Sequence, residues 1–114
     1  HRVNVAEDCI ASGLFETLQF PFSYISSDRD LALADKCREA DMGYIAMKGL
    51  AGGMLTNARA CHAFMKSHDN VVPIWGIQKM EELEQWLSLA REDPDMDEEL
   101  AAFTDFFTKK FATK

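Results

Sequence analysis

Residues 43–55 have the sequence GYIAMKGLAGGML, and this stretch decides the fold class. It opens with the apolar run 44–47, which glycines bound on both sides. A short run of this kind is typical of a strand that is buried on both faces of a parallel sheet. Residues 48–53 (KGLAGG) then form the exit loop, and residues 57–67 (NARACHAFMKS) have the apolar spacing of a helix. The stretch therefore predicts a strand, a glycine-rich loop and a helix.

A second unit of this kind precedes the stretch. Residues 17–24 (TLQFPFSY) are rich in β-branched and aromatic side chains, which favours a strand. Pro21 has no N–H for a strand ladder, so we expect the strand to end or loosen there. Residues 26–28 offer helix N-caps, and the apolar stripe that follows predicts a helix to about Met42 with Gly43 as its stop.

A third unit follows, and further helices lie at both ends. The apolar run 71–77 (VVPIWGI), which Pro73 interrupts and Gly76 closes, predicts a third strand, and residues 79–91 are predicted to form an amphipathic helix. Residues 5–12 (VAEDCIAS) predict a short helix that stops at Gly13. A last helix, at residues 97–112, has an aromatic stripe made by Leu100, Phe103, Phe106, Phe107 and Phe111. We therefore divide the chain into a strand–helix part, residues 1–96, and a C-terminal amphipathic helix, residues 97–114.

Alternating strands and helices indicate an α/β fold with a parallel sheet. A doubly wound sheet and a (β/α)8 TIM barrel both fit this pattern. Gly49, Gly52 and Gly53 do not make the GxGxxG fingerprint of the doubly wound dinucleotide fold, which favours the barrel. A complete barrel takes about 250 residues. With 114 residues, the chain is expected to form part of one, with three parallel strands.

Composition limits which classes of partner and which cellular compartment are expected for the protein. The net charge of -7 argues against nucleic acid and anionic membrane as main partners, because both favour clusters of Lys and Arg. No stretch has the roughly 20 apolar residues of a membrane helix, and no signal peptide pattern is present, so we expect a cytoplasmic protein. Cys9, Cys37 and Cys61 have no metal-ligand spacing. Cys9 and Cys37 are expected to be buried free thiols.

Ligands of parallel α/β folds gather at the carboxyl ends of the strands. This rule selects Gln19 and Phe20, residues 47–50 and residues 75–78. The loop KGLAGG is suited to a phosphate, because glycines let backbone amides approach it and Lys48 adds positive charge. A tight turn into the next helix explains the loop equally well. His62 lies among apolar neighbours and is expected to be a half-buried imidazole on a helix rather than a general base.

The residues after Gly76 resemble a second anion site, since a helix starts near Lys79 and its free amides favour negative charge. Glu81 and Glu82 occupy the first turn of that helix. They complement the helix dipole and would repel a second phosphate.

Residues 14–20 (LFETLQF), 43–55 and 71–87 (VVPIWGIQKMEELEQWL) resemble the last three strand–helix units of the aldo/keto reductases. They look most like the bacterial branch that often adds an iron–sulfur segment, and the resemblance covers about residues 3–100. It implies the C-terminal part of a (β/α)8 barrel. It also implies an oxidoreductase that binds NADPH or NADH and reduces a small carbonyl substrate by hydride transfer.

The resemblance implies roles for individual residues near the nicotinamide and the pyrophosphate. Gln19 corresponds to the glutamine beside the nicotinamide carboxamide. Met47 stands where an aromatic residue usually stacks on the nicotinamide ring. Lys48, Gly49 and Leu50 match the loop on the pyrophosphate side, with Gly49 in place of the usual proline.

On the adenosine side, the resemblance is carried by Gly76, Ile77 and Gln78, which match the loop there. Trp86 replaces the asparagine that reads adenine. Glu82 stands where a basic residue often meets the 2′-phosphate of NADPH, and this departure is more compatible with NADH.

The family's catalytic Asp, Tyr, Lys and His belong to the first four strand regions, which the resemblance does not cover. The iron–sulfur cysteines would follow residue 100, and residues 103–114 (FTDFFTKKFATK) contain no Cys, so no cluster is expected in this chain. We therefore expect a fragment that is inactive alone and needs the N-terminal half of the barrel or a second copy as partner. A non-catalytic binding or self-assembling half-barrel module, and a homologue that binds nucleotide without turnover, are the alternatives.

Overall fold

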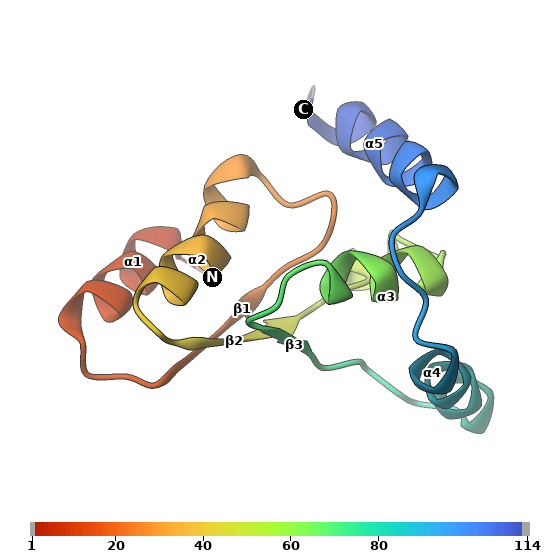
Figure 1. Cartoon of the computed structure of the whole chain (residues 1–114), viewed down its shortest axis with the longest axis horizontal. Helices are drawn as coiled ribbons and strands as arrows, with labels where there is room; N and C mark the ends of the chain where they lie inside the picture. Colours follow the sequence, from red (N-terminus) through yellow and green to blue (C-terminus); the bar gives the residue numbers. More distant parts are fainter. Residues whose placement is uncertain (1, 113–114) are drawn as a thin grey trace.

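The computed structural model describes residues 2–112, and three parallel strands alternate with helices along the chain (Figure 1). Residue 1 and residues 113–114, the ends of the two predicted parts, lie outside the described residues. In chain order the elements are α1 (Val3–Ser12), β1 (Thr17–Pro21), α2 (Asp28–Glu39), β2 (Gly43–Met47), the short 3-10 helix η1 (Ala51–Gly53), α3 (Ala58–Lys66), β3 (Val71–Pro73), α4 (Met80–Glu92) and α5 (Glu98–Ala112).

The sheet has the order β1-β2-β3, so neighbours in the sheet are also neighbours in the chain. In the register, Phe20 pairs with Ala46 and Tyr44 pairs with Val71. The side chains of these four residues are all buried. The alternate positions form the other face of the sheet, and they are half-buried or exposed: Thr17, Gln19, Ile45, Met47 and Val72. The helices therefore cover one face of the sheet, and we call the second face the open face.

The open face corrects one prediction from the sequence. The run 44–47 was expected to be buried on both faces, but Ile45 and Met47 are only half-buried. Parallel crossovers are right-handed in nearly all proteins. When consecutive strands are added in the same direction, that handedness places every crossover helix on the same face. No helix of the described chain is left to cover Ile45 and Met47.

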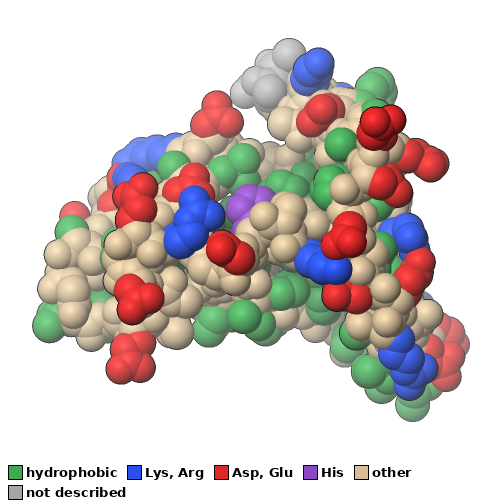
Figure 2. All heavy atoms as spheres, viewed as in Figure 1, with side chains coloured by type: hydrophobic (Ala, Val, Ile, Leu, Met, Phe, Trp, Pro, Cys, Tyr) green, Lys and Arg blue, Asp and Glu red, His purple; other side chains and the backbone are tan. Residues whose placement is uncertain are grey.

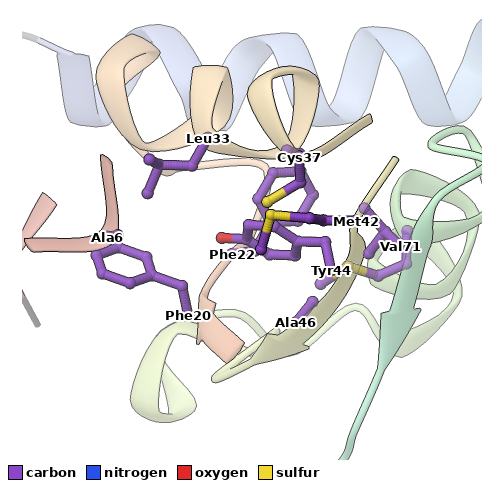
Figure 3. Packing of buried hydrophobic residues seen from close by; sticks show 11 residues of the cluster. Ala6, Phe20, Phe22, Leu33, Cys37, Met42, Tyr44, Ala46 and Val71 are labelled. Carbon is purple, nitrogen blue, oxygen red and sulfur yellow. The ribbon is translucent and has the colours of Figure 1, made fainter. Parts of the chain in front are cut away.

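The main core lies between the covered face and α2. Figure 3 shows Phe20, Tyr44 and Ala46 of the strands on one side and Leu33 and Cys37 of α2 on the other. Full burial of a large apolar side chain contributes about 1.5–3 kcal/mol. These contacts fix β1 and β2 in position, and with them the ends of the strands.

A second core joins α3 to α5. Leu100 of α5 is buried in a cluster with Tyr24 and Cys61, and the rings of Phe103 and Tyr24 have centroids 6.5 Å apart. The Thr108 hydroxyl donates a hydrogen bond of 2.6 Å to the carbonyl oxygen of Tyr24. The predicted aromatic stripe is thus largely a packing surface.

Local side-chain chemistry explains where the helices begin and end. Ser27 caps α2 by accepting from the Asp30 amide, and Asn57 caps α3 by accepting from the Ala60 amide. Gly13 ends α1 in the left-handed conformation, as predicted, with a φ of 69°. The predicted stop at Gly43 is wrong, since α2 ends at Glu39 and Asp41 adopts a φ of 57°. Gly43 instead begins β2.

The last strand is shorter than expected. The predicted run 71–77 was interrupted by Pro73, and β3 ends at that residue. The Ile74 amide still donates 2.9 Å to the carbonyl of Ala46, and the chain then leaves the sheet. The Trp75 ring stacks on Trp86 of α4 with centroids 3.9 Å apart and an interplanar angle of 8°. Pro73 has no N–H to donate to the ladder, which is consistent with the strand ending there.

Within residues 2–112, no helix is both long enough and apolar enough to cross a bilayer. Cys37 and Cys61 are buried free thiols, and burial raises the pKa of the Cys61 thiol to about 12. The prediction for Cys37 is therefore confirmed. Cys9 is only half-buried, because one side of α1 has no neighbouring element among the described residues.

Candidate functional site

A cavity of about 630 Å³ lies at the carboxyl ends of β2 and β3. This volume falls within the range of about 300–1,000 Å³ that is common for small-molecule sites. We call it the strand-end pocket. Its lining residues are Met47, Lys48, Gly49, Leu50, Gly52, Gly53, Ile74, Trp75, Gly76, Gln78 and Glu82. The fold thus brings together two loops that the sequence analysis selected separately.

The loop after β2 turns sharply, because several residues adopt the left-handed conformation. Lys48 has a φ of 54°, Ala51 of 51° and Gly52 of 67°. The Ala51 amide donates 2.8 Å to the Lys48 carbonyl, which closes the turn. Among residues 2–112, no acceptor lies within hydrogen-bond reach of the N–H groups of Gly49 and Leu50. Unpaired amides in such turns are suited to anions.

Lys48 supplies positive charge beside these amides. Its side chain is exposed and forms no ion pair with any described residue. An unpaired ammonium next to unpaired amides can compensate the charge of a phosphate or carboxylate. The two features fit a small anion at this end of the loop.

Gly49 is required by packing. A Cβ atom at this position would lie 2.4 Å from Cζ3 of Trp75 and 3.0 Å from Cε of Met65. Any residue with a Cβ, proline included, would displace the Trp75 ring. The glycine and the tryptophan therefore belong together, and Trp75 forms a wall of the pocket.

The pocket ends at the start of α4. The Gln78 amide donates a hydrogen bond of 3.3 Å to Oε2 of Glu82, and Glu82 is half-buried. Lys79 is the N-cap, but its side chain makes no capping hydrogen bond. Glu82 therefore satisfies the amide of Gln78, which precedes the N-cap and is not one of the unpaired amides of the first helical turn.

Three of the predicted cofactor residues lie outside the lining, namely Gln19, Ile77 and Trp86. Trp86 is buried, and its ring is stacked on Trp75. Ile77 is exposed. Gln19 lies on the open face, with Nε2 3.7 Å from Sδ of Met47, so it lies next to the pocket without lining it.

Ile74 lines the pocket and was missed in the sequence. It follows Pro73, and its side chain lies two positions beyond Val72 of the open face. Alternation with a period of two along β3 was the signal that could have found it. The run 71–77 has apolar residues at nearly every position, which hid that alternation.

Two titratable residues outside the pocket, His62 and Lys66, join α3 to the segment after α4. His62 is half-buried on α3, with Nε2 3.2 Å from Oδ1 of Asp93, as expected for an imidazole on a helix. Lys66 contacts Asp93 and Asp95 at 2.9 and 2.8 Å. Within residues 2–112, no three His, Cys, Asp or Glu side chains are grouped so that they could hold a metal ion.

No protein-family model, no curated protein and no solved structure matches this chain.

Proposed function

We propose that the chain is the cofactor-binding part of a (β/α)8 barrel that uses NADPH or NADH. More specifically, we assign it to the aldo/keto reductases, which reduce small carbonyl compounds. One observation carries the proposal: the strand-end pocket contains every predicted cofactor residue except Gln19, Ile77 and Trp86. These residues come from the loop after β2 and from the segment between β3 and α4, which are distant in sequence.

The open face supports a barrel. A complete doubly wound sheet has helices on both faces, although one βαβαβ half of it, with consecutive strands, has its crossover helices on a single face. In a barrel, helices cover the outer face and the remaining strands close over the inner face. Residues such as Ile45, Met47 and Val72 would lie inside the completed barrel, and their apolar side chains suit that position.

The pocket residues fit most of the proposed cofactor. Lys48 and the unpaired amides of Gly49 and Leu50 are suited to the diphosphate, and Ile74 and Trp75 give an apolar wall for a ring. Trp86 does not fit the adenine-reading role that the resemblance implies, because its ring is stacked on Trp75. We assign that residue to the support of the pocket wall.

When bound, the nicotinamide supplies hydride chemistry. In the proposed complex, Lys48 would compensate the charge of the diphosphate, and the side chains of Met47 and Ile74 would exclude water from the pocket. The described lining contains Lys48 and Glu82 as its ionisable side chains. The group that protonates the reduced carbonyl oxygen is proposed to come from the rest of the barrel, so the chain alone binds nucleotide without reducing a carbonyl.

Isothermal titration calorimetry with NADH and NADPH tests the proposal. The variant Lys48→Ala removes the cation at the pocket and should weaken binding about tenfold or more, since a hydrogen bond to a charged group is worth about 1.5–3 kcal/mol. Lys109→Ala, which removes the same charge from the end of α5, should leave affinity unchanged. Absence of saturable binding to a chain with native circular dichroism would refute the proposal.

A second candidate, self-assembly of the chain, is favoured by exposed apolar side chains near the sheet edges. Leu14 is 81% exposed and Val72 is 63% exposed. Figure 2 shows further hydrophobic side chains over α4 at the lower right, where Met80 is 65% exposed. Unpaired strand edges with apolar neighbours promote association between chains. In this account the partner is a second copy.

Sedimentation velocity at micromolar concentration tests self-assembly. A dimer that Val72→Lys dissociates, and that Phe106→Lys on α5 leaves intact, would support it. Val72 and Phe106 are both exposed and apolar. The comparison of the two variants therefore distinguishes association through the open face from association through any exposed apolar side chain. A monomeric wild-type chain would rule this candidate out.

A further inference from the structure

We infer that α4 is a movable wall of the strand-end pocket and that three basic side chains of α3 hold it closed. These side chains, Arg59, His62 and Lys66, are called the α3 latch. The latch controls opening of the pocket for any ligand, so this device goes beyond the proposed function and does not depend on the nicotinamide cofactor.

α4 is joined to the rest of the chain by two links that contain neither helix nor strand. Residues 74–79 connect β3 to α4, and residues 93–97 connect α4 to α5. In Figure 1, α4 lies at the edge of the molecule, beyond the end of β3. Links of this kind can absorb the changes in φ and ψ that accompany a hinge movement. The connectivity therefore allows α4 to move as a unit.

Few apolar side chains hold α4 in place. Trp86 and Leu89 are the buried residues of this 13-residue helix, and their core cluster adds one buried residue of α3, Ala58. In the 9-residue helix α3, five residues are buried. Local opening requires the least free energy where few apolar contacts are lost. We therefore expect α4 to open more readily than α3 or the sheet.

The α3 latch contacts the C-terminal end of α4. Its three residues are spaced three and four positions apart, which places them on one face of α3. Arg59 forms an ion pair with Glu92, the last residue of α4, and His62 Nε2 lies 3.2 Å from Oδ1 of Asp93. The latch thus bridges the end of α4 and the link that follows it.

Lys66 makes the largest share of these contacts. Its Nζ atom lies 2.9 Å from Oδ2 of Asp93 and 2.8 Å from Oδ1 of Asp95, and it donates a hydrogen bond of 2.8 Å to the carbonyl oxygen of Asp93. Carbonyls at the C-terminal end of a helix lack partners within the helix, so this bond also satisfies one of them. The Asp95 side chain is 85% exposed, so salt should weaken the contact. Lys66 therefore clamps the link about which α4 turns.

Movement of α4 changes the strand-end pocket directly. Glu82 of α4 lines the pocket, and Trp86 of α4 stacks on the Trp75 ring, which also lines it. When α4 leaves α3, Trp75 loses the ring that covers it and the wall loses Glu82. The pocket is then open on the α4 side, so the latch determines how often this side opens.

Native-state hydrogen exchange of the full chain, resolved by NMR and without ligand, tests the inference. We expect the α4 amides to exchange through a local opening, faster than the most protected amides of α3 and β2 and with little dependence on low concentrations of urea. Raising NaCl from about 0.05 M to about 0.5 M should speed α4 exchange severalfold, because the salt screens the exposed ion pairs.

Lys66→Met removes the ammonium group and keeps most of the apolar stem. It should speed exchange of the α4 amides about fivefold, the upper range for exposed ion pairs, and abolish most of the salt dependence. Lys66→Arg keeps the charge and should retain most of the protection. Lys36→Met is the matched control, since Lys36 of α2 forms an ion pair of 2.6 Å with Glu7 of α1, and this contact survives when α4 opens. It should leave α4 exchange unchanged, even where it lowers the stability of the whole chain.

Three results would overturn the inference. The first is exchange of the α4 amides at the rate of the most protected α3 amides, because α4 would then open only with global unfolding. The second is unchanged α4 exchange in Lys66→Met. The third is an equal effect of Lys66→Met and Lys36→Met on α4. None of these results bears on nucleotide binding, which the calorimetric titrations decide separately.

Discussion

Two residues, Gly49 and Trp75, determine the shape of the pocket. The absence of a Cβ at position 49 lets the Trp75 ring lie against the backbone of the loop after β2. Trp86 covers the ring from the side of α4. The pocket wall therefore consists of the Gly49 backbone, the Trp75 ring packed against it and the Trp86 ring stacked on Trp75. A substitution at any of the three is expected to shift the other two.

We predict that Gly49→Ala destabilises the chain by about 1–3 kcal/mol, the usual cost of overpacking a filled site. The new Cβ would lie 2.4 Å from Cζ3 of Trp75, so the ring must shift. Urea unfolding followed by tryptophan fluorescence measures the change. Gly76→Ala is the matched control in the same pocket, since a Cβ at position 76 would meet no atom within 4 Å, and it should change stability by less than about 0.5 kcal/mol. Equal effects of the two substitutions would contradict this role for Gly49.

The sequence predicted many site residues but not how they are used. The carboxyl-end rule and the glycine-rich loop selected Lys48, Gly49 and Gln78, and all of them line the pocket. Trp86 was assigned to the ligand, but it packs on Trp75. Nothing in a single sequence shows which of two tryptophans on separate elements will face a cavity, because the answer depends on the distance between those elements in space.

At the scale of elements, a group of ion pairs and hydrogen bonds connects α3 to the segment between α4 and α5. Lys66 contacts Asp93 and Asp95 at 2.9 and 2.8 Å, and His62 lies 3.2 Å from Asp93. Asp93 ends α4 in the left-handed conformation, with a φ of 50°. Hydrogen bonding to Lys66, and then to His62, lowers the pKa of the Asp93 carboxyl below its usual value of 3.8.

This contact predicts a pH dependence of stability. Because the folded-state pKa of Asp93 is lowered, its contribution is present above the unfolded value and is lost as the pH falls through the lower folded value. Asp93→Asn keeps a residue that tolerates the left-handed conformation and removes the charge. We expect a slightly lower Tm than wild type at pH 6, with the difference shrinking as the pH falls below 3.8, the usual pKa of the carboxyl. Thermal unfolding by circular dichroism measures it, and a difference that is constant from about pH 6 to about pH 2.5 would contradict the charge-based account.

Some ends of helices and strands could be predicted from sequence patterns, and others could not. The cap at Ser27, the stop at Gly13 and the break at Pro21 were local signals in the sequence, and the structure follows them. The end of α2 was misplaced because the apolar side chain of Met42 continues the helical stripe, although Met42 is buried after the helix has ended. A stripe reports burial and does not distinguish a helix from the turn that follows it.

For the whole molecule, the main feature is a three-stranded parallel sheet with helices on one face. The alternation of strands and helices predicted the parallel sheet. It did not predict the open face, because the runs 44–47 and 71–74 are apolar throughout and look buried on both sides. Strand order in space decides which faces are covered, and that order is not encoded in any one segment. The open face and the pocket at its edge are the features on which the proposed partial barrel rests.

The central claim is that a nicotinamide dinucleotide binds in the strand-end pocket, and chemical-shift perturbation of the 15N-labelled chain tests it most directly. On titration with NADH, we predict saturable shifts of the Gly49, Leu50 and Gln78 amides and of the Trp75 indole N–H, with the α5 amides unchanged. Shifts confined to residues away from the loop after β2 and the start of α4, or none at saturating nucleotide, would contradict the account.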